Sequence, residues 1–546
     1  MHTLGLEMGD HGETVPVAKP EAVVGGRIPV GLDEGGAPLG PGCARRETRG
    51  LSLSRAAPGA LPADARGPVV ASAVSSDLQR VLDELGKGLE VPGAAAGVYL
   101  EGRATFAFHG VTSVENPLPV DERTLFQFGS IGKTYTAAAV LRLVEQGRID
   151  LGAPVRTYVP ELRLKDTGVA DRVTVLHLLN HTAGWAGDVF DDTGDGDDAV
   201  AKYVELMATL DQVSPLGATV SYNNASLSLA GRVIEKLTGK VYEQAIRDLV
   251  LEPLGLRDTW FFPNDVMTRR FVVGHTRHRS GRLTVARPWA MPRGGNPAGG
   301  MVATAADQIA WARFHLGGGS APDGSLVLSR ATVLQMQEPT TGLPGLPGSA
   351  SDDRIGISWF LRDVEGERLV EHGGSTIGQH ANFVMVPARE FAVISMTNCD
   401  PNGSQLNKLL ADWALEHYLG LKERAPELRA LDDDTLSEYV GRYETIEAVC
   451  DITALDGRLV ARVETKPEVK AALQEPDDEP EDEPAELLPL AIVEGEGEPF
   501  VVTGGSDRGE RGHFSRSSDG LVSGVHLYGR FAVRSGPSLP RRRRDG

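Results

Sequence analysis

The sequence pattern changes near residue 430, and this change constrains the fold more than any other feature of the chain. Between about residues 76 and 422, helical patterns alternate irregularly with short apolar runs, which is typical of one large α/β domain. Beyond that point, short β-like runs such as YVGRYE, DGRLVARV and PFVVTGG are separated by turn residues and indicate a small all-β unit. The chain is therefore predicted to contain an α/β domain at residues 73–424 and an all-β domain at residues 431–536.

Three further segments are predicted to lie outside the two packed cores. Residues 1–72 are rich in glycine, proline and alanine and show little periodicity, so we expect a disordered N-terminal extension. EPDDEPEDEPAE, at residues 475–486, is expected to form an acidic, solvated insert within the all-β domain. Residues 537–546 are expected to form a frayed tail.

The charge and the apolar pattern exclude some classes of partner. A formal net charge of −20 argues against nucleic acid, because phosphate contacts need a basic surface. No apolar run of about 18 residues is present, so no integral membrane segment is expected. MHTLGLEMGDHGETVPV lacks the basic and apolar regions of a secretory signal. A cytoplasmic location is therefore expected, with export to the periplasm or the medium as the alternative if the true start lies downstream.

The stretch FGSIGKTYTAAAVLRLVEQ allows two interpretations. Its Gly132-Lys133-Thr134 resembles the end of a phosphate-binding loop, but the first glycine of that motif would fall at Gln127. In the other interpretation, Ser130 begins a helix and Lys133 lies three residues later on the same face. A buried lysine whose pKa is lowered can take the proton of a serine hydroxyl. We therefore interpret Ser130 as a candidate nucleophile and Lys133 as its base.

A second motif, Tyr222-Asn223-Asn224, precedes the helical pattern ASLSLAGRVIEKL. A phenol between Ser130 and Lys133 could relay a proton in both directions, which predicts an acid–base role for Tyr222. The Asn224 amide could bond to Lys133 and to a substrate carbonyl.

A third motif, His372-Gly373-Gly374-Ser375, begins HGGSTIGQHANFVMVP. Small residues allow a substrate backbone to approach the edge of a strand. The backbone N–H of Ser375 could join that of Ser130 in an oxyanion hole.

Taken in order, SIGK, YNN and HGG resemble the motifs of the serine β-lactamase and penicillin-binding protein family. The resemblance is to its class C-like branch, which includes D-aminopeptidases, alkaline D-peptidases and family VIII carboxylesterases. LLNHTAGW, NPAGGMVATAADQIAWARFHL and DLVLEPLGLRDTWF are also similar to this family. The resemblance covers about residues 76–422 and implies an α/β (α+β) fold, with a helical subdomain beside an antiparallel sheet and the site between them. The all-β domain looks like the lipocalin-like domains attached to such hydrolases.

The resemblance also implies roles for individual residues. Ser130 would form an acyl-enzyme, and Lys133 and Tyr222 would share the base and acid duties. Asn224 would orient the substrate and Lys133. The remaining residues, which would line the opposite wall, are His372, Gly374 and Ser375. No cofactor and no metal is implied, and the expected partner is a small-molecule or peptide substrate.

One departure from the family pattern bears on the substrate. Class C β-lactamases begin the third motif with a lysine, whose charge helps to seat the β-lactam carboxylate, whereas His372 is neutral or weakly charged at pH 7. An ester, an amide or a D-amino-acid peptide is therefore preferred as substrate. The alternatives are a β-lactamase proper, or a non-catalytic protein that binds a peptide or cell-wall fragment on the same fold. Intact Ser130, Lys133 and Tyr222 argue against the binding protein.

Overall fold

The computed structural model describes residues 73–536, except 279, 341–353, 468, 470–485, 495–496 and 506. The predictions for residues 1–72, for the acidic insert up to 485 and for the tail at 537–546 lie outside the described residues. Within the described helices, none is long and apolar enough to cross a membrane.

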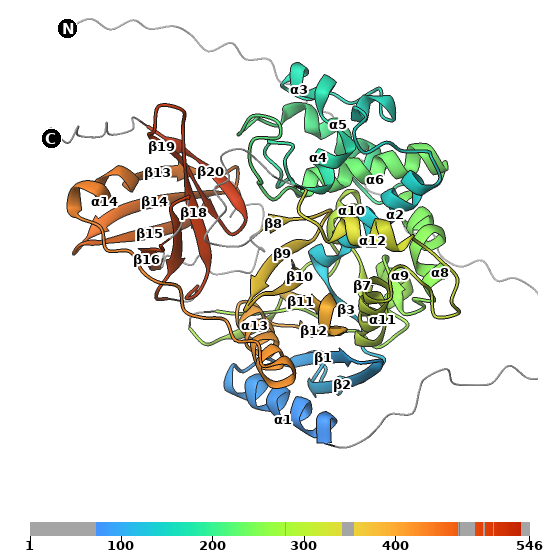
Figure 1. Cartoon of the computed structure of the whole chain (residues 1–546). Coiled ribbons are helices and arrows are strands. Elements are labelled where there is room, and N and C mark those ends of the chain that lie inside the picture. Colours follow the sequence, from blue (N-terminus) through green and yellow to red (C-terminus); the bar gives the residue numbers. More distant parts are fainter. Residues whose placement is uncertain are drawn as a thin grey trace, which may run out of the picture. The chain divides into compact units, whose positions relative to one another are not determined.

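A seven-stranded antiparallel sheet forms the centre of the α/β domain (Figure 1). Its strand order is β2-β1-β12-β11-β10-β9-β8, so the hairpin of β1 and β2 pairs with a strand near residue 390. The strands are β1 (Gly93–Leu100), β2 (Arg103–Gly110), β8 (Arg354–Ile355), β9 (Phe360–Val364), β10 (Glu367–Thr376), β11 (Gln379–Val386) and β12 (Phe391–Thr397). The predicted antiparallel sheet is confirmed. AAAGVYLEGRATFAFHG, whose two short apolar runs are split by Glu101-Gly102 and predict a hairpin, forms β1 and β2.

The two faces of this sheet are covered by different helices. Apolar side chains of α1 (Ala73–Gly88) and α13 (Asn402–Ala414), including Leu82 and Leu406, pack on one face. On the other face lies α11 (Ala305–Leu316), where Ile309 approaches Gly97 so closely that a Cβ there would lie 2.8 Å from it. Both faces are therefore buried, as in a layered α/β domain.

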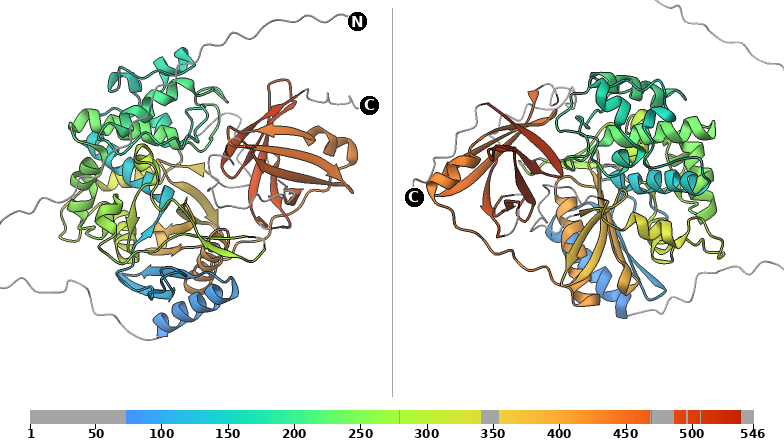
Figure 2. Two further views of the ribbon diagram at one scale, coloured as in Figure 1. Left: turned by 180° about the vertical axis from the view of Figure 1, so that it is seen from behind. Right: turned by 45° about the horizontal axis from the view of Figure 1, so that its top comes forward.

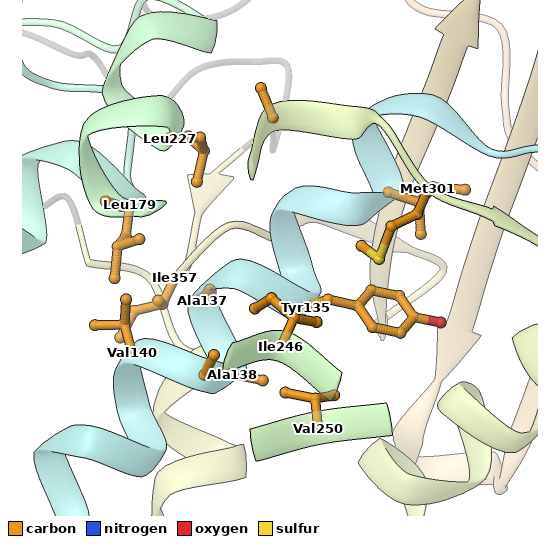
Figure 3. Close-up of a cluster of buried hydrophobic side chains, with 14 of the residues drawn as sticks. Tyr135, Ala137, Ala138, Val140, Leu179, Leu227, Ile246, Val250, Met301 and Ile357 are labelled. Carbon is orange, nitrogen blue, oxygen red and sulfur yellow. The ribbon is translucent and has the colours of Figure 1, made fainter. Parts of the chain in front are cut away.

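The helical subdomain surrounds α2 (Gly132–Glu145), in which eleven of the fourteen residues are buried. Its small residues let neighbouring helices approach closely, and Figure 3 shows Ala137, Ala138 and Val140 of α2 among side chains from other segments. Further α-helices of the α/β domain are α3 (Thr167–Arg172), α4 (Val175–Leu179), α5 (Ala199–Leu206), α6 (Asn224–Thr238), α7 (Tyr242–Ile246), α8 (Glu252–Leu254), α9 (Pro263–Val266), α10 (Asn296–Gly299) and α12 (Arg330–Met336). This packing fixes the start of α2, where the SIGK motif lies.

Two small sheets complete the α/β domain. One joins β3 (Phe126–Gln127), β7 (Val302–Ala303) and β4 (Thr259–Trp260), and the other pairs β5 (His275–Arg277) with β6 (Leu283–Val285). The first of them leads the chain directly into the SIGK motif.

The C-terminal strands close into an eight-stranded barrel, preceded by α14 (Asp433–Tyr439) (Figure 2). The strands are β13 (Gly441–Glu444), β14 (Ala448–Leu455), β15 (Arg458–Thr465), β16 (Leu487–Ile492), β17 (Pro499–Val502), β18 (Arg511–Arg516), β19 (Val522–Leu527) and β20 (Arg530–Ser535). A separate all-β domain is thus confirmed. The β-like runs predicted for this domain did not include β14. One of those runs, LVSGVHLYGRFAVR, forms two strands, β19 and β20, rather than one.

Tyr528 and Gly529 form the two-residue turn between β19 and β20. Both have a positive φ, 53° and 74°, as the tight hairpin turns that suit twisted strands require. The turn fixes the position of Arg530, the first residue of β20.

Candidate active site

The SIGK motif lies where the helical subdomain meets β10. Ser130 is in a 3₁₀ turn (Gly129–Ile131) directly before α2, and Lys133 is in the first turn of α2. The sequence prediction placed Ser130 at the start of the helix, and the structure places it in the 3₁₀ turn just ahead of the helix. The Lys133 Nζ is nevertheless 2.9 Å from the Ser130 Oγ and also donates to the Ala298 carbonyl over 2.7 Å. Ser130 and Lys133 are thus in direct contact.

Lys133 is fully buried, with an exposed fraction of 0%. Burial lowers the pKa of its amine well below the ordinary value, Asp188 opposes this shift, and the charge of Arg530 adds to it. No carboxylate among the described residues forms an ion pair with the amine. The neutral form, which can accept a proton, is therefore favoured.

Tyr222 lies beside this pair, with its ring centroid 4.7 Å from the Lys133 Nζ. Burial raises the pKa of the phenol, while a hydrogen bond with Ser130 partly offsets the rise. The phenol therefore stays protonated at neutral pH and can donate. The backbone N–H of Tyr222 donates to the Gly529 carbonyl over 2.8 Å, which joins this segment to the barrel turn.

Asn224, the first residue of α6, does not bond to Lys133, in contrast to the contact expected from the sequence. Its Nδ2 donates instead to Asp188 Oδ1 over 2.6 Å. Arg530 donates to both oxygens of Asp188, from Nε over 2.5 Å and from Nη2 over 3.1 Å. The guanidinium is also 5.2 Å from the Tyr222 ring centroid. The structure therefore adds Asp188 and Arg530 to the predicted site.

The sequence analysis missed both of these residues. Asp188 lies just before the acidic stretch DDTGDGDDAV and belongs to none of the three motifs. Arg530 belongs to the barrel, 342 residues away from Asp188. The only available signal was the hairpin turn that precedes Arg530.

The HGG motif is on β10, opposite Ser130. A Cβ on Gly374 would lie 1.9 Å from the Phe128 carbonyl oxygen and 3.0 Å from the Ser130 nitrogen. A Cβ on Gly129 would lie 2.7 Å from the Ser375 nitrogen. The two backbones approach this closely only because both positions are glycine.

His372 is buried next to these glycines, and its Nδ1 lies 2.5 Å from the Gly373 carbonyl. Burial, with a smaller contribution from Lys133, lowers the pKa of the imidazole to about 3. His372 is therefore neutral at physiological pH and does not replace the charge of the family's lysine.

A groove of about 1150 Å³ runs over these residues. Residues from all three motifs line it, and residues of the barrel form part of its wall. The motif residues are Ser130, Tyr222, Asn224, His372, Gly374 and Ser375, and the barrel residues include Tyr528, Gly529 and Arg530. The structure thus brings the predicted site residues together around one groove, with Lys133 buried beneath it.

A nucleophile-like serine bonded to a buried lysine, on a helical subdomain beside an antiparallel sheet, defines a class of acyl-transfer proteins. The β-lactamase family model matches residues 78–416, and the chain belongs to this family. Penicillin-binding protein 4 of Amycolatopsis lactamdurans is 34% identical over 321 residues, which are 59% of this chain and 84% of that protein. Esterase EstB of Burkholderia gladioli is 35% identical over 35% of this chain and 52% of its own length.

Among solved structures, SurE with D-Leu has a similar fold, with a TM-score of 0.63 and 23% identity. The similarity covers 84% of this chain and 99% of that one, a larger share than the residues that the family model matches. The family consists of serine hydrolases, and its fold is the one predicted from the motifs.

Proposed function

We propose that this protein is a serine hydrolase that forms an acyl-enzyme at Ser130 and acts on an ester, an amide or a D-amino-acid peptide bond. The observation that carries the proposal is the contact of 2.9 Å between the Ser130 Oγ and a fully buried lysine amine. A serine hydroxyl becomes a nucleophile when an adjacent base takes its proton. Burial lowers the pKa of Lys133 well below its ordinary value and so favours the neutral amine that can act as this base.

Acylation follows from this arrangement. Neutral Lys133 accepts the proton of Ser130 while the Oγ forms a bond to the substrate carbonyl carbon. The backbone N–H groups of Ser130 and Ser375 donate to the carbonyl oxygen as it becomes negative. When the tetrahedral intermediate collapses, the bond to the leaving group breaks, and Tyr222 donates the proton that the leaving group needs. Lys133 then returns a proton to Tyr222.

In deacylation, water is the nucleophile and the Ser130 Oγ is the leaving group. Water attacks the acyl carbon, and the Tyr222–Lys133 pair takes its proton. The acyl–Oγ bond breaks and Ser130 recovers its proton, so that acid and free enzyme are formed.

The choice among substrates rests on the charge at the third motif. Neutral His372 offers no cation for a β-lactam carboxylate, which favours substrates without that requirement. The names of two similar proteins, an esterase and a SurE bound to D-Leu, support an ester or a D-amino-acid acyl group. A β-lactamase proper is the second candidate, favoured by the family itself.

Labelling with a fluorophosphonate tests the proposal. We expect an adduct on the peptide that contains Ser130 in the wild type, and none on that peptide in Ser130→Ala. Ser437→Ala removes an exposed serine of α14 and should label like the wild type. Full hydrolytic activity in Ser130→Ala would refute the proposal.

Initial rates on a p-nitrophenyl ester, a D-alanyl anilide and a chromogenic cephalosporin would rank the substrates. We expect the ester and the anilide to exceed the cephalosporin. Tight peptide binding with no turnover of any substrate would instead support the non-catalytic alternative.

We also propose that the barrel contributes to the site through Arg530. Because the charge of Arg530 helps to lower the pKa of Lys133 and Asp188 opposes it, Arg530→Ala should raise that pKa. The acid limb of the pH profile of kcat/KM should then move to higher pH. At a pH on that limb, kcat/KM should fall about tenfold, which corresponds to about 1.4 kcal/mol. The control is Arg442→Ala, which breaks an exposed Arg–Asp pair within the barrel. An unchanged pH profile would exclude this role.

A further inference from the structure

We propose that Ser375, His380 and Asp400 form a second acyl-accepting site, of the Ser-His-Asp type, on the opposite face of β10 from Ser130. The Ser375 Oγ is 2.9 Å from the His380 Nδ1, and the His380 Nε2 is 2.8 Å from Asp400 Oδ1. These three residues are in the order and at the distances that a serine, its base and the residue that orients the base require.

The Ser375 side chain lies on a different face of β10 from the one that contacts the Ser130 turn. Neighbouring residues of a strand point to opposite faces, and Gly374 lies against the Ser130 nitrogen. The Ser375 side chain therefore points away from Ser130. Ser375 pairs directly with His380 on β11, so their side chains share the face covered by α13.

The base is held rigidly in the sheet, while the serine is accessible. His380 is 8% exposed, and a Cβ on Gly403 would lie 3.3 Å from its ring, so the first turn of α13 packs on the imidazole. Asp400 is fixed through its backbone, which donates to the His275 carbonyl and accepts from the Arg277 N–H, each over 2.8 Å. Ser375 itself is exposed in the groove.

The tautomer follows from the partners. A carboxylate oxygen accepts, so in the tautomer that matches these contacts the His380 Nε2 carries the proton and donates to Asp400. The Nδ1 lone pair then faces the Ser375 hydroxyl and can accept its proton. In the common triad the Nε2 of the histidine faces the serine and the Nδ1 faces the aspartate, whereas in His380 the Nδ1 faces Ser375 and the Nε2 faces Asp400. Either nitrogen of an imidazole can act as the base.

The groove continues past Ser375 along α13. Ser404, Asn407, Lys408 and Ala411 line it, which are positions of one helix face. Ser375 is exposed in the same groove, so an ester bound along α13 can reach its hydroxyl. The substrate class is a small carboxylic ester.

The reaction is ester hydrolysis in two steps. His380 takes the Ser375 proton while the Oγ bonds to the carbonyl carbon, and the same proton passes to the departing alcohol as the ester C–O bond breaks. Water then attacks acyl-Ser375 and gives a proton to His380, the acyl–Oγ bond breaks, and that proton returns to Ser375. The products are one acid and one alcohol per ester and water consumed.

The test uses the full chain with Ser130→Ala as the background, so that only the second serine can react. Fluorophosphonate labelling followed by peptide mapping should give one adduct, on the peptide that contains Ser375. Adding His380→Gln or Asp400→Asn should slow this labelling by about 10²-fold or more, since each removes part of the acid–base pair. Adding Ser437→Ala, which removes an exposed serine of α14 whose hydroxyl donates to the Asp434 carbonyl, should leave the rate unchanged.

Two results would overturn the inference. One is no adduct on the Ser375 peptide of Ser130→Ala when its melting temperature equals that of the wild type. The other is labelling at an unchanged rate in Ser130→Ala/His380→Gln. Neither affects the proposed function, which depends on the adduct at Ser130 in the wild type. Conversely, a Ser375 adduct without any Ser130 adduct would support this inference and refute the proposed function.

Discussion

Replacement of Lys133 by methionine should lower kcat/KM about 10²–10⁴-fold on a D-alanyl anilide, which is an amide and not the ester proposed as the substrate of Ser375. Methionine has a volume similar to that of lysine and carries no ionisable group, so the packing at the start of α2 should persist. What is lost is the base 2.9 Å from the Ser130 Oγ, and a positioned acid–base group contributes about 10²–10⁴-fold to rate. Steady-state kinetics, together with circular dichroism to verify the fold, would measure the effect.

The matched control is Lys202→Met, which removes an exposed lysine paired with Asp198 on α5. It should keep wild-type kinetics, because that pair lies on the surface, where such interactions contribute little. A Lys133→Met variant that retained more than a tenth of the wild-type rate would assign the base to another group.

The pH dependence of the wild type follows from the same lysine. Burial lowers the pKa of Lys133, and only the neutral amine accepts a proton. Below this pKa the amine is protonated and acylation is slow, so kcat/KM should rise with pH through it. The plateau should be reached well below about 10.4, the ordinary lysine pKa. A rise of kcat/KM centred near the ordinary lysine pKa would show that the Lys133 amine is solvated rather than buried.

Substitution of Gly374 by alanine should lower kcat/KM about 10²–10³-fold, the effect of losing one oxyanion donor. A Cβ at this position would lie 1.9 Å from the Phe128 carbonyl, a backbone atom that cannot rotate away. Strand β10 must then move away from the turn that contains Ser130. That movement would misplace the Ser375 N–H relative to the Ser130 N–H.

Gly373→Ala is the adjacent control. Its Cβ would meet only the Ala381 carbonyl oxygen, at 3.8 Å, and Gly373 is exposed. It should therefore change kcat/KM by less than about threefold, a change of below about 0.7 kcal/mol. If Gly373→Ala and Gly374→Ala lowered kcat/KM equally, the close approach of β10 to the Ser130 turn would not be the reason why Gly374 is needed.

Several elements could be predicted from the sequence because their signals are local. The Ser130–Lys133 contact depends on a spacing of three residues at the start of a helix, and the β1–β2 hairpin on two apolar runs that flank Glu101-Gly102. The change in pattern near residue 430 likewise indicated a separate β domain, which closes into a barrel. Strand β14 was missed because AVCDITAL mixes polar and apolar residues without a strict alternation, although Asp456-Gly457 follows it as a turn signal.

Other features of the site were decided only by the tertiary structure. Asn224 has Lys133 as a plausible partner in the sequence, but in the fold it donates to Asp188. Asp188 in turn binds Arg530, 342 residues away on the barrel. Ser375 and His380 are close in sequence, yet only the pairing of β10 with β11 and the position of Asp400 after β12 bring them into one hydrogen-bonded chain. Helix periodicity and turn preferences depend on a few neighbouring residues, so they can be predicted from the sequence. The partners of a buried charge depend on which distant segments pack around it, so only the tertiary structure determines them.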